Sequence, residues 1–325
     1  ALGGAGLVFV ETTHVAREDN IEIRAGGASL RTSTRHPVLV YRDGVQRYVR
    51  ADEVVMTDAL VNKTFAWRAD DATMLEAWFA GAHLGDGSAY EKHHGYRPNR
   101  RAWKERAQSL GRRFIFKIRA AEREVVERYA AFFAGFCASR AQVVAATTVN
   151  GTPVWDYTVA SFAASRATEL IDGQVGAKTA HLHVPAWIAR HPERHFLPFL
   201  AGLIDTDGTV GREHGSASIA TQNATFAGEL KALLGLFGVH AGLTLRQPRE
   251  HEYRGHAIRD SGGAMLKISD SAFLAEVARY MADGGKRARI LECASRSGQY
   301  ARYVLPLDLR NALAEHAAAV RLCAI

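Results

Sequence analysis

A nine-residue pattern that occurs twice constrains this chain more than any other feature of the sequence. The copies are FAGAHLGDG, residues 79–87, and LAGLIDTDG, residues 200–208. Both have Ala-Gly near the start and Asp-Gly at the end. One copy alone fits a surface loop after a buried helix, but a loop does not account for the same pattern twice. The repetition predicts two equivalent structural units in one chain.

The first copy ends a segment with helical periodicity, residues 70–87. Asp70 and Asp71 are candidate N-caps at its start, and Gly87 is a candidate C-cap at its end. We therefore expect a helix that begins at the paired aspartates and ends at the Asp-Gly.

The second copy ends a similar segment, residues 191–208. Pro192 lies in its expected first turn, and Gly208 follows its expected end. Because proline disrupts a helix interior and Pro198 lies inside the pattern, the helix is expected to begin near Pro198.

The segments that follow the two copies also correspond. Each copy is followed by a polar stretch, a strand, a helix and a further β pair. The expected strands are 112–120 and 216–222, the expected helices are 122–136 and 224–238, and the β pairs fall within 141–159 and 239–269. This order predicts an α+β fold built from two repeats.

Residues 1–68 have a different character and read as β structure. Short alternating or β-branched runs follow one another there, and no helical period appears before Asp70. The Asp43-Gly44 pair between two such runs is a strong signal for a hairpin. We expect a β-rich segment before the repeats.

Composition narrows the class of protein. At 325 residues with 47% hydrophobic residues, the chain has room for two or three cores. No apolar run reaches the length of a membrane span, and no secretory signal is recognised. Three scattered cysteines give neither a disulfide framework nor a metal-type spacing. We expect a cytoplasmic protein of bacterial or phage-like origin, without membrane contact.

Positive charge is concentrated in two segments. Residues 92–119 hold ten Lys or Arg and a single acid, and residues 246–260 form a weaker second segment. Beside a repeated acidic motif, double-stranded DNA is a better partner for this charge than solvent alone. The candidate DNA-binding residues are Lys92, Arg97, Arg100, Arg101, Lys104, Arg112, Arg113, Lys117, Arg119, Arg246, Arg249, Arg254 and Arg259.

The paired aspartates Asp86 and Asp207 are the strongest candidates for chemistry. Small residues in both motifs allow two helices to pack closely. Two such helices side by side bring the carboxylates together at their C-terminal ends. Close carboxylates repel unless a cation lies between them, and hard oxygen ligands suit Mg²⁺. That arrangement fits metal-assisted hydrolysis of a phosphodiester.

The paired motifs resemble those of the LAGLIDADG homing endonucleases, over roughly residues 70–310. The resemblance implies a pseudo-two-fold pair of αββαββα repeats whose antiparallel sheets bind DNA. It also implies a monomer that uses Mg²⁺ or Mn²⁺, with Asp86 and Asp207 as catalytic metal ligands and Gly85 and Thr206 beside them. In this family a basic residue assists each site. The family's linker lysine precedes an Ile-Pro, but Leu182 stands three residues before Pro185 here, so Lys178 is the substitute candidate and Lys267 its counterpart.

The stretch LRTSTRHPVLVYRDG resembles the Thr-x-x-His region of inteins, with Ser33 in the threonine place and His36 as the histidine. The resemblance implies a Hint-like splicing segment, reminiscent of inteins in ribonucleotide reductases. An intein normally begins with Cys or Ser and ends with His-Asn, whereas this chain begins with Ala1 and ends RLCAI. Splicing needs those nucleophiles, so the chain as given is not expected to splice.

These expectations give a domain plan and a function. The plan is a Hint-like segment at 1–68, a first repeat at 69–169, a linker at 170–190, a second repeat at 191–310 and a C-terminal helix or tail at 311–325. The expected function is that of an intein-encoded homing endonuclease that makes double-strand cuts in a long asymmetric site. Two alternatives stay open: a splicing element with a decayed nuclease, and a non-catalytic nucleic-acid binder such as a maturase or regulator.

Overall fold

The computed structural model describes two units, formed by residues up to Leu60 and from Trp67 to Arg296. The described residues are 2–3, 6–7, 19–25, 28–43, 45–60, 67–68, 71–91, 113–137, 141–148, 151–161, 163–176, 181–212, 215–253, 256–260 and 262–296. None of the helices within these ranges is long and apolar enough to cross a bilayer.

The N-terminal unit consists of short antiparallel strands, as the sequence predicts. Its elements are β1 (Leu2–Gly3), β2 (Gly6–Leu7), β3 (Asn20–Ala25), β4 (Ala28–Ser33), β5 (Pro37–Arg42), β6 (Val45–Arg50), the short helix η1 (Ala51–Glu53) and β7 (Ala59–Leu60). They form the pairs β1–β2 and β3–β4 and the sheet β6–β5–β7. Arg42 pairs with Val45, and Asp43 has a φ of 53°, so the predicted two-residue hairpin is confirmed. A small core forms around Val38 and Val40.

The second unit repeats one order of elements twice. The first half contains α1 (Met74–Leu84), β8 (Ser88–Glu91), β9 (Phe114–Ala120), α3 (Arg123–Ala134), β10 (Val144–Thr147), β11 (Pro153–Ser161), α4 (Ser165–Leu170) and α5 (Ala186–Arg190). The second half contains α6 (Pro192–Thr206), β12 (Gly208–Val210), β13 (Ala217–Thr221), α7 (Ala224–Leu236), β14 (Ala241–Arg246), β15 (Arg249–Tyr253), β16 (His256–Asp260), β17 (Gly263–Ile268), α8 (Ser271–Ala278) and α9 (Gly284–Arg296). The predicted α+β repeat is therefore present.

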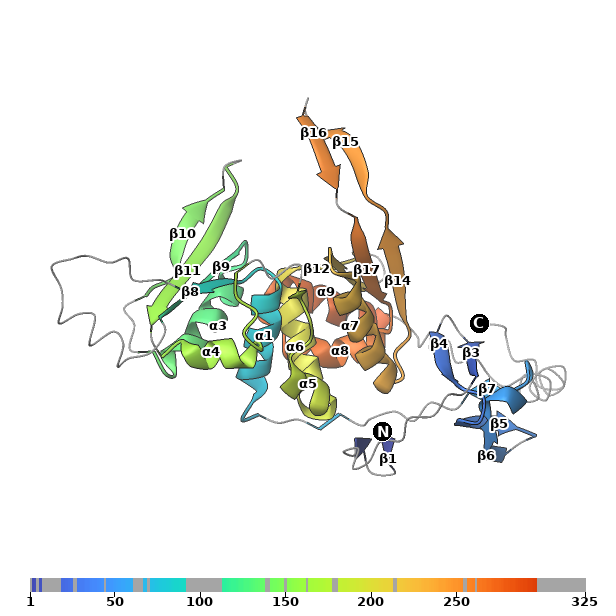
Figure 1. Cartoon of the computed structure of the whole chain (residues 1–325). Helices are drawn as coiled ribbons and strands as arrows, with labels where there is room; N and C mark the ends of the chain where they lie inside the picture. The colour runs from blue at the N-terminus through green and yellow to red at the C-terminus, as the bar shows by residue number, and fades with distance from the viewer. Residues whose placement is uncertain are drawn as a thin grey trace, which may run out of the picture. The chain divides into compact units, whose positions relative to one another are not determined.

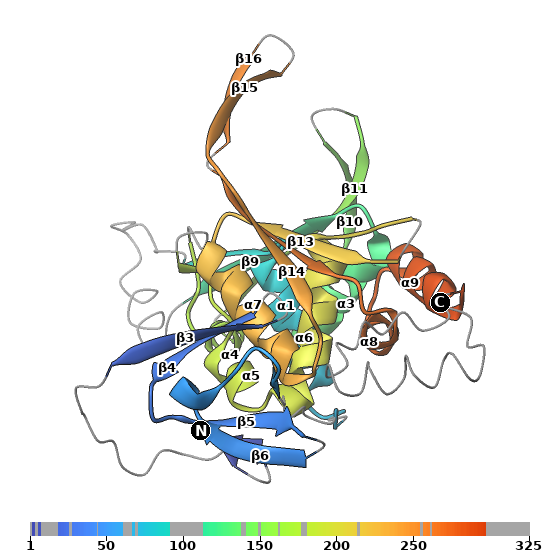
Figure 2. The same cartoon turned by 90° about the vertical axis from the view of Figure 1, so that its right-hand side faces the viewer.

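Each half has a four-stranded antiparallel sheet. The strand orders are β10-β11-β9-β8 and β12-β13-β17-β14. The helices α1 and α6 lie side by side between the two sheets, with α3 packed against one sheet and α7 against the other (Figure 1). Seen from the side, the β10–β11 hairpin and the β15–β16 hairpin extend away from the helices in the same general direction (Figure 2). One sheet face in each half is therefore buried by helices.

The core of this unit is formed by the two central helices and the buried sheet faces. Strand β9 alternates in burial from Phe116 to Ala120, as expected for a sheet with one covered face. An aromatic cluster packs Phe79 of α1 against Phe132 and Phe133 of α3, with ring centroids 3.8 Å and 5.4 Å apart. The motif helix is thereby fixed to its own half of the unit.

The expected helix ends are partly wrong. Helix α1 begins at Met74 rather than at the paired aspartates, and its C-cap is Gly85 rather than Gly87. The backbone leaves the helix at Gly85, where φ is −71° and ψ is −105°. The chain then has only Asp86 and Gly87 before β8 begins.

The expected start of α6 near Pro198 is also wrong, because the helix begins at Pro192 and continues through Pro198. Proline removes one hydrogen bond from a helix interior. Phe196, Leu197, Phe199 and Leu200 around it are all at most 1% exposed. Their packing offsets that loss, and Pro192 occupies the first turn as predicted.

Candidate functional site: the ends of two touching helices

The backbones of α1 and α6 are in direct contact at their glycines. A Cβ atom at Gly81 would collide with the carbonyl oxygen of Phe199, and one at Gly202 would collide with the carbonyl oxygen of Trp78. The close approach predicted from the small residues of both motifs is thus confirmed. Any larger side chain at either glycine forces the helices apart.

The contact continues to the C-terminal ends of both helices, where the candidate aspartates lie. A Cβ atom at Gly85 would collide with Oγ1 of Thr206 and would lie 3.4 Å from the backbone nitrogen of Asp207. The residue before Asp86 therefore packs against the residue before Asp207. Both aspartates are exposed. Among the described residues, none donates a hydrogen bond to the Asp86 carboxylate or forms an ion pair with it.

The chemistry of these groups fits a hard divalent cation. Two carboxylates at the negative ends of two helix dipoles repel each other and attract positive charge. No group of three or more His, Cys, Asp or Glu side chains within the described ranges is placed to hold a metal ion. A cation at this position would rely on Asp86, Asp207, backbone oxygens and water, a donor set that Mg²⁺ accepts.

A lysine lies in the sheet row that follows each aspartate. In the first half, Ser88 of β8 pairs with Lys117 of β9, which pairs with Thr158 of β11. In the second half the row is Thr209, Ser218 and Lys267. Both lysines are exposed. The two rows are equivalent by topology, yet Lys117 lies on the second strand of its row and Lys267 on the third.

The two rows add a basic residue to the candidates predicted for the site. Sequence comparison matched Lys267 with Lys178, which lies outside the described residues. The strand registers place Lys117, which the sequence predicted only as a DNA-binding residue, in the row equivalent to that of Lys267. Register is set by the tertiary pairing of strands far apart in the chain, so spacing along the sequence does not reveal it.

The other predicted DNA-binding residues lie in different parts of the fold. Arg119 donates from Nε and Nη2 to both oxygens of Asp156, at 2.6 Å each, so an acid already engages this expected phosphate ligand. Arg113 precedes β9 and Arg246 ends β14. Arg249 and Arg259 lie on the paired strands β15 and β16. The candidates outside the described residues are Lys92, Arg97, Arg100, Arg101, Lys104, Arg112 and Arg254.

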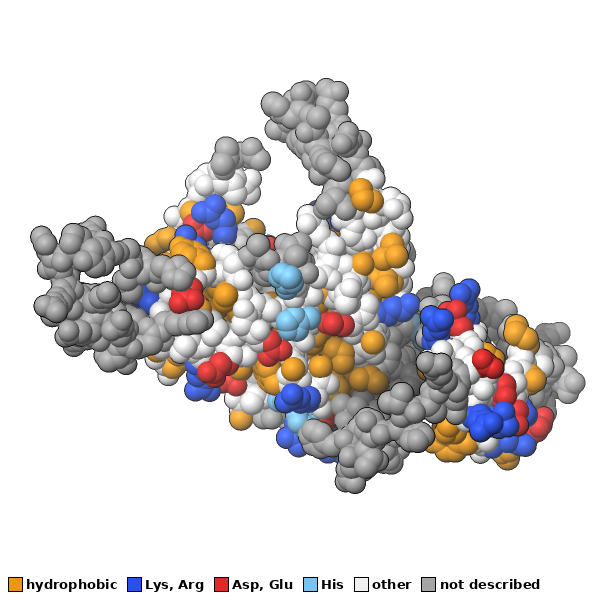
Figure 3. Space-filling view, viewed as in Figure 1, with side chains coloured by type: hydrophobic (Ala, Val, Ile, Leu, Met, Phe, Trp, Pro, Cys, Tyr) orange, Lys and Arg blue, Asp and Glu red, His pale blue; other side chains and the backbone are white. Residues whose placement is uncertain are grey.

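The exposed faces of the two sheets differ in chemistry. One row of the first half holds Arg119, Asp156 and Val144, and its topological equivalent in the second half holds Ala220, Met265 and Thr244. Figure 3 shows charged side chains of both signs around β10 and β11, and mainly uncharged and hydrophobic ones around β14 and α7. The two halves thus present different surfaces on the same framework.

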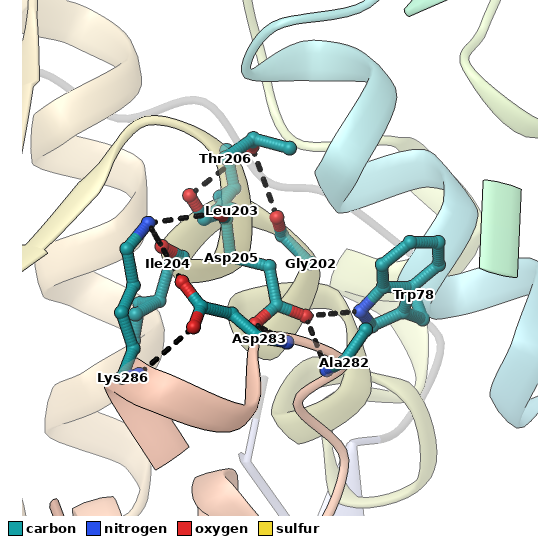
Figure 4. Close-up of polar contacts among 9 residues, drawn as sticks. All are labelled: Trp78, Gly202, Leu203, Ile204, Asp205, Thr206, Ala282, Asp283 and Lys286. Carbon is teal, nitrogen blue, oxygen red and sulfur yellow. Dashed lines mark hydrogen bonds and ion pairs between the residues drawn. The ribbon is translucent and has the colours of Figure 1, made fainter. Parts of the chain in front are cut away.

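Asp205 of the second motif has no acidic counterpart in the first motif, where Leu84 stands. Asp205 is 1% exposed, so a surface role is excluded. Its Oδ2 accepts hydrogen bonds from Trp78 Nε1 and from the Ala282 backbone, both at 2.7 Å (Figure 4). Its Oδ1 accepts one from the Asp283 backbone at 3.1 Å. Asp205 therefore joins α1, α6 and the segment before α9.

Burial dominates the ionisation of this network. Burial raises the pKa of Asp205 to about 6, although the N–H donors of Ala282, Trp78 and Asp283 favour its charged form. Arg128 lies over the Trp78 ring, 4.7 Å from its centroid, and donates to the Tyr280 carbonyl. Burial lowers the pKa of Arg128, and the nearby Asp205 opposes that change. The charges beneath the motif helices are thus coupled.

Sequence reasoning missed Asp283 and Lys286, which complete this network. Lys286 donates from Nζ to the backbone carbonyls of Ile204 and Asp205. The only signal in the sequence is an aspartate before the helical segment that begins at Gly284, which is typical of an N-terminal cap. Nothing in the sequence indicates that the same residues meet a helix end some eighty positions earlier.

The splicing candidates are only partly described. Ser33 ends β4 and His36 is exposed just before β5. The His36 amide donates to the Ser33 carbonyl at 3.1 Å, and the Ala51 amide donates to the His36 carbonyl at 2.9 Å. The first bond closes a tight turn between β4 and β5, and the second joins this turn to the start of η1. Ala1 and the expected tail at 311–325 lie outside the described residues.

Comparison with known proteins supports the second repeat most directly. The family model of the LAGLIDADG-like domain matches residues 197–257, which include most of α6 and the strands from β12 to β15. The chain therefore carries a LAGLIDADG-like domain. No curated protein matches the chain.

Several solved structures are similar at low identity. The homing endonuclease I-WcaI bound to its DNA recognition sequence has 12% identity and a TM-score of 0.42, over 67% of this chain and 86% of that one. I-DmoI in complex with DNA and Mn has 12% identity and a TM-score of 0.38, over 66% and 99%. Full-length DUF199/WhiA from Thermatoga maritima has 13% identity and a TM-score of 0.37, over 78% and 69%. Values in this range establish neither a family nor a function.

Proposed function

We propose that this protein is a site-specific DNA endonuclease of the LAGLIDADG type that makes metal-dependent double-strand cuts. The observation that carries the proposal is the convergence of Asp86 and Asp207 at the touching ends of α1 and α6. One acidic residue per repeat suits a reaction carried out once on each strand of a duplex. The match of residues 197–257 to a LAGLIDADG-like domain supports the same class.

The aspartates and the lysines have different proposed roles. Asp86 and Asp207 hold Mg²⁺ or Mn²⁺, with the backbone at Gly85 and Thr206 beside them. When bound, the cation polarises the scissile phosphate and lowers the pKa of water. Lys117 and Lys267, one in each half, bind the phosphate that approaches the exposed sheet row and stabilise its negative charge. The lysine of the linker, Lys178, remains a further candidate.

The substrate is a long asymmetric DNA duplex. The two sheets offer equivalent frameworks with unlike side chains, such as Arg119 and Asp156 against Ala220 and Met265. Two unlike surfaces favour two unlike half-sites. A single chain contains both repeats, so a monomer suffices for both strands. The arm β15–β16 adds length to the second half, and the described strands of the first half include no counterpart of it.

The N-terminal unit is proposed to derive from an intein. The β-rich architecture and the turn from Ser33 to His36 fit a Hint-like segment. The natural target is then the intein-free allele of the host gene, whose cleavage provokes copying of the element.

Cleavage of a duplex library tests the function. The purified chain is incubated with the library in Mg²⁺ and in EDTA, and the cut ends are sequenced. Asp86→Asn and Asp207→Asn remove a metal-binding carboxylate each, and Asp71→Asn at the other end of α1 is the matched control. We expect one long site, cut only with the metal, by the unchanged chain and by Asp71→Asn.

The other outcomes separate the alternatives. If the unchanged chain binds one duplex site but does not cut it, the proposed nuclease activity is contradicted. That result supports a decayed enzyme or a regulator. Cutting that persists in both Asp86→Asn and Asp207→Asn contradicts the assigned site. A gel-shift measurement on every variant distinguishes lost binding from lost chemistry.

A further inference from the structure

The last turn of α6 is held by groups from outside the helix. The final carbonyls of a helix have no partner within it and need donors from elsewhere. Lys286 Nζ donates to the carbonyl of Ile204 at 2.9 Å and to that of Asp205 at 2.8 Å. Thr206 Oγ1 donates to the carbonyl of Gly202 at 3.0 Å. The turn that carries Asp207 is therefore closed by an ammonium group and a hydroxyl.

The ammonium group itself is held in place. Lys286 is 15% exposed at its side chain, and its Nζ lies 3.6 Å from Oδ2 of Asp283. Oδ1 of Asp283 accepts the Lys286 backbone N–H at 2.9 Å, and the Asp283 N–H donates to Asp205 Oδ1. With Asp283 only 2% exposed, the pair is shielded from water. Figure 4 shows these groups gathered around the end of α6.

The first repeat has different residues at the corresponding places. Leu84 stands where the second repeat has Asp205, and Gly85 stands where it has Thr206. Neither Leu84 nor Gly85 provides a carboxylate or a hydroxyl group. The two candidate metal ligands, Asp86 and Asp207, therefore follow helix ends that are fixed by different means.

A largely buried cation at a helix C-terminus has two effects. It offsets the negative end of the helix dipole, next to which Asp207 is placed. It also fixes the backbone from which the Asp207 side chain extends, and a catalytic group has to be held within about 0.5 Å of its working position. Both effects act on the second half of the site.

We propose that Lys286 is a positioning residue that preorganises the Asp207 half of the site, so that the two strands of the substrate depend on it unequally. This inference rests on the proposed nuclease function. Lys286 acts through the carbonyls of Ile204 and Asp205 and does not itself touch DNA. Its removal should therefore change the rate of cutting and leave the affinity for DNA unchanged.

The test is a strand-resolved cleavage assay. A supercoiled plasmid that carries the recognition site is digested in Mg²⁺, and the rates of nicking and of linearisation are measured for each strand by end-labelling. Lys286→Met removes the ammonium group, Lys286→Arg keeps the charge, and Arg287→Met is the matched control on the exposed side of α9. Hydrogen exchange of peptides covering 203–210 and 81–88 is measured on the same samples.

We expect Lys286→Met to reduce the cutting rates of the two DNA strands unequally. Lys286→Met should slow one strand by about 10-fold to 100-fold more than the other, so that nicked plasmid accumulates. Exchange should rise in 203–210 and stay unchanged in 81–88. Lys286→Arg should restore part of the rate, and Arg287→Met should behave like the unchanged chain.

Two outcomes overturn the inference. Equal slowing of both strands by Lys286→Met, or no slowing, shows that Lys286 only contributes to stability or is dispensable. Unchanged exchange in 203–210 shows that Lys286 does not hold the turn. If neither the unchanged chain nor Arg287→Met cuts DNA, the proposed function fails, and the exchange measurement alone decides whether Lys286 fixes the helix end.

Discussion

The indole Nε1 of Trp78 donates a hydrogen bond of 2.7 Å to Oδ2 of Asp205, and this bond joins the two motif helices beneath the candidate site. Both residues are at most 1% exposed. A hydrogen bond to a buried carboxylate contributes more than one between neutral groups. The bond therefore stabilises the side-by-side arrangement that places Asp86 and Asp207 at one end.

Removing this donor should destabilise the second unit. Trp78→Phe keeps an aromatic ring and leaves one bond of Asp205 unmade, which should lower the free energy of unfolding by about 1.5–3 kcal/mol. Trp187→Phe is the control, because Trp187 donates to the neutral carbonyl of Leu170 and should cost about 1 kcal/mol. Urea unfolding followed by circular dichroism measures both. Equal losses would contradict a special role for the Asp205 carboxylate.

The glycine contact between the helices should tolerate no side chain. Gly81→Ala and Gly202→Ala each place a methyl group against a backbone carbonyl of the other helix, and each should cost about 3 kcal/mol or more. Gly228→Ala in α7 is the control, because a Cβ atom there meets nothing within 4 Å. Gly228→Ala should raise the free energy of unfolding by up to about 1 kcal/mol, because alanine has the higher helix propensity. Thermal melts of the three variants separate steric from conformational effects.

The N-terminal unit should lose stability in acid through Asp58. Its side chain is fully buried, and it accepts hydrogen bonds of 2.6 Å from Nε and Nη2 of Arg42. Arg42, chiefly through these bonds, lowers the pKa of Asp58 below its ordinary value. Because the folded pKa is below the unfolded one, the contribution is present above about pH 4 and is lost as the pH falls further.

Asp58→Asn should therefore lower the urea midpoint of this unit at pH 7, and the difference from the unchanged chain should shrink toward pH 3. Hydrogen exchange of the β5–β6 peptides in increasing urea gives the midpoint. Asp43→Asn is the control, because the exposed pair of Asp43 with Arg47 contributes little. A difference that stays constant with pH would contradict the ion pair as its source.

The lysines of the two equivalent rows should bind phosphate. Lys117→Ala and Lys267→Ala should each weaken DNA binding and lower the slope of log affinity against log salt by about 1. Arg119→Ala should have a smaller effect, because Asp156 already engages its guanidinium group. Arg279→Ala, at the C-cap of α8 and paired with Glu276, should leave DNA binding unchanged. Salt titrations of fluorescence anisotropy test all four.

The sequence by itself determined the plan of this protein. A repeated motif of small residues ending in Asp-Gly indicated two helices in contact and two carboxylates at their ends, and the helices touch at Gly81 and Gly202. Local patterns also predicted the Asp43-Gly44 hairpin and the strands and helices after each motif. These signals are local because caps, turns and periodicity depend on neighbouring residues.

Only the tertiary structure decided which distant groups complete the site. Strand register placed Lys117 and Lys267 in equivalent rows of the two sheets, and Lys286 reached the end of α6 from a helix that begins about eighty residues later. Asp205 is buried against Trp78, unlike an exposed aspartate. The residue type alone does not indicate this burial. Burial, register and capping by remote side chains arise from packing, and packing is a property of the folded chain rather than of any segment.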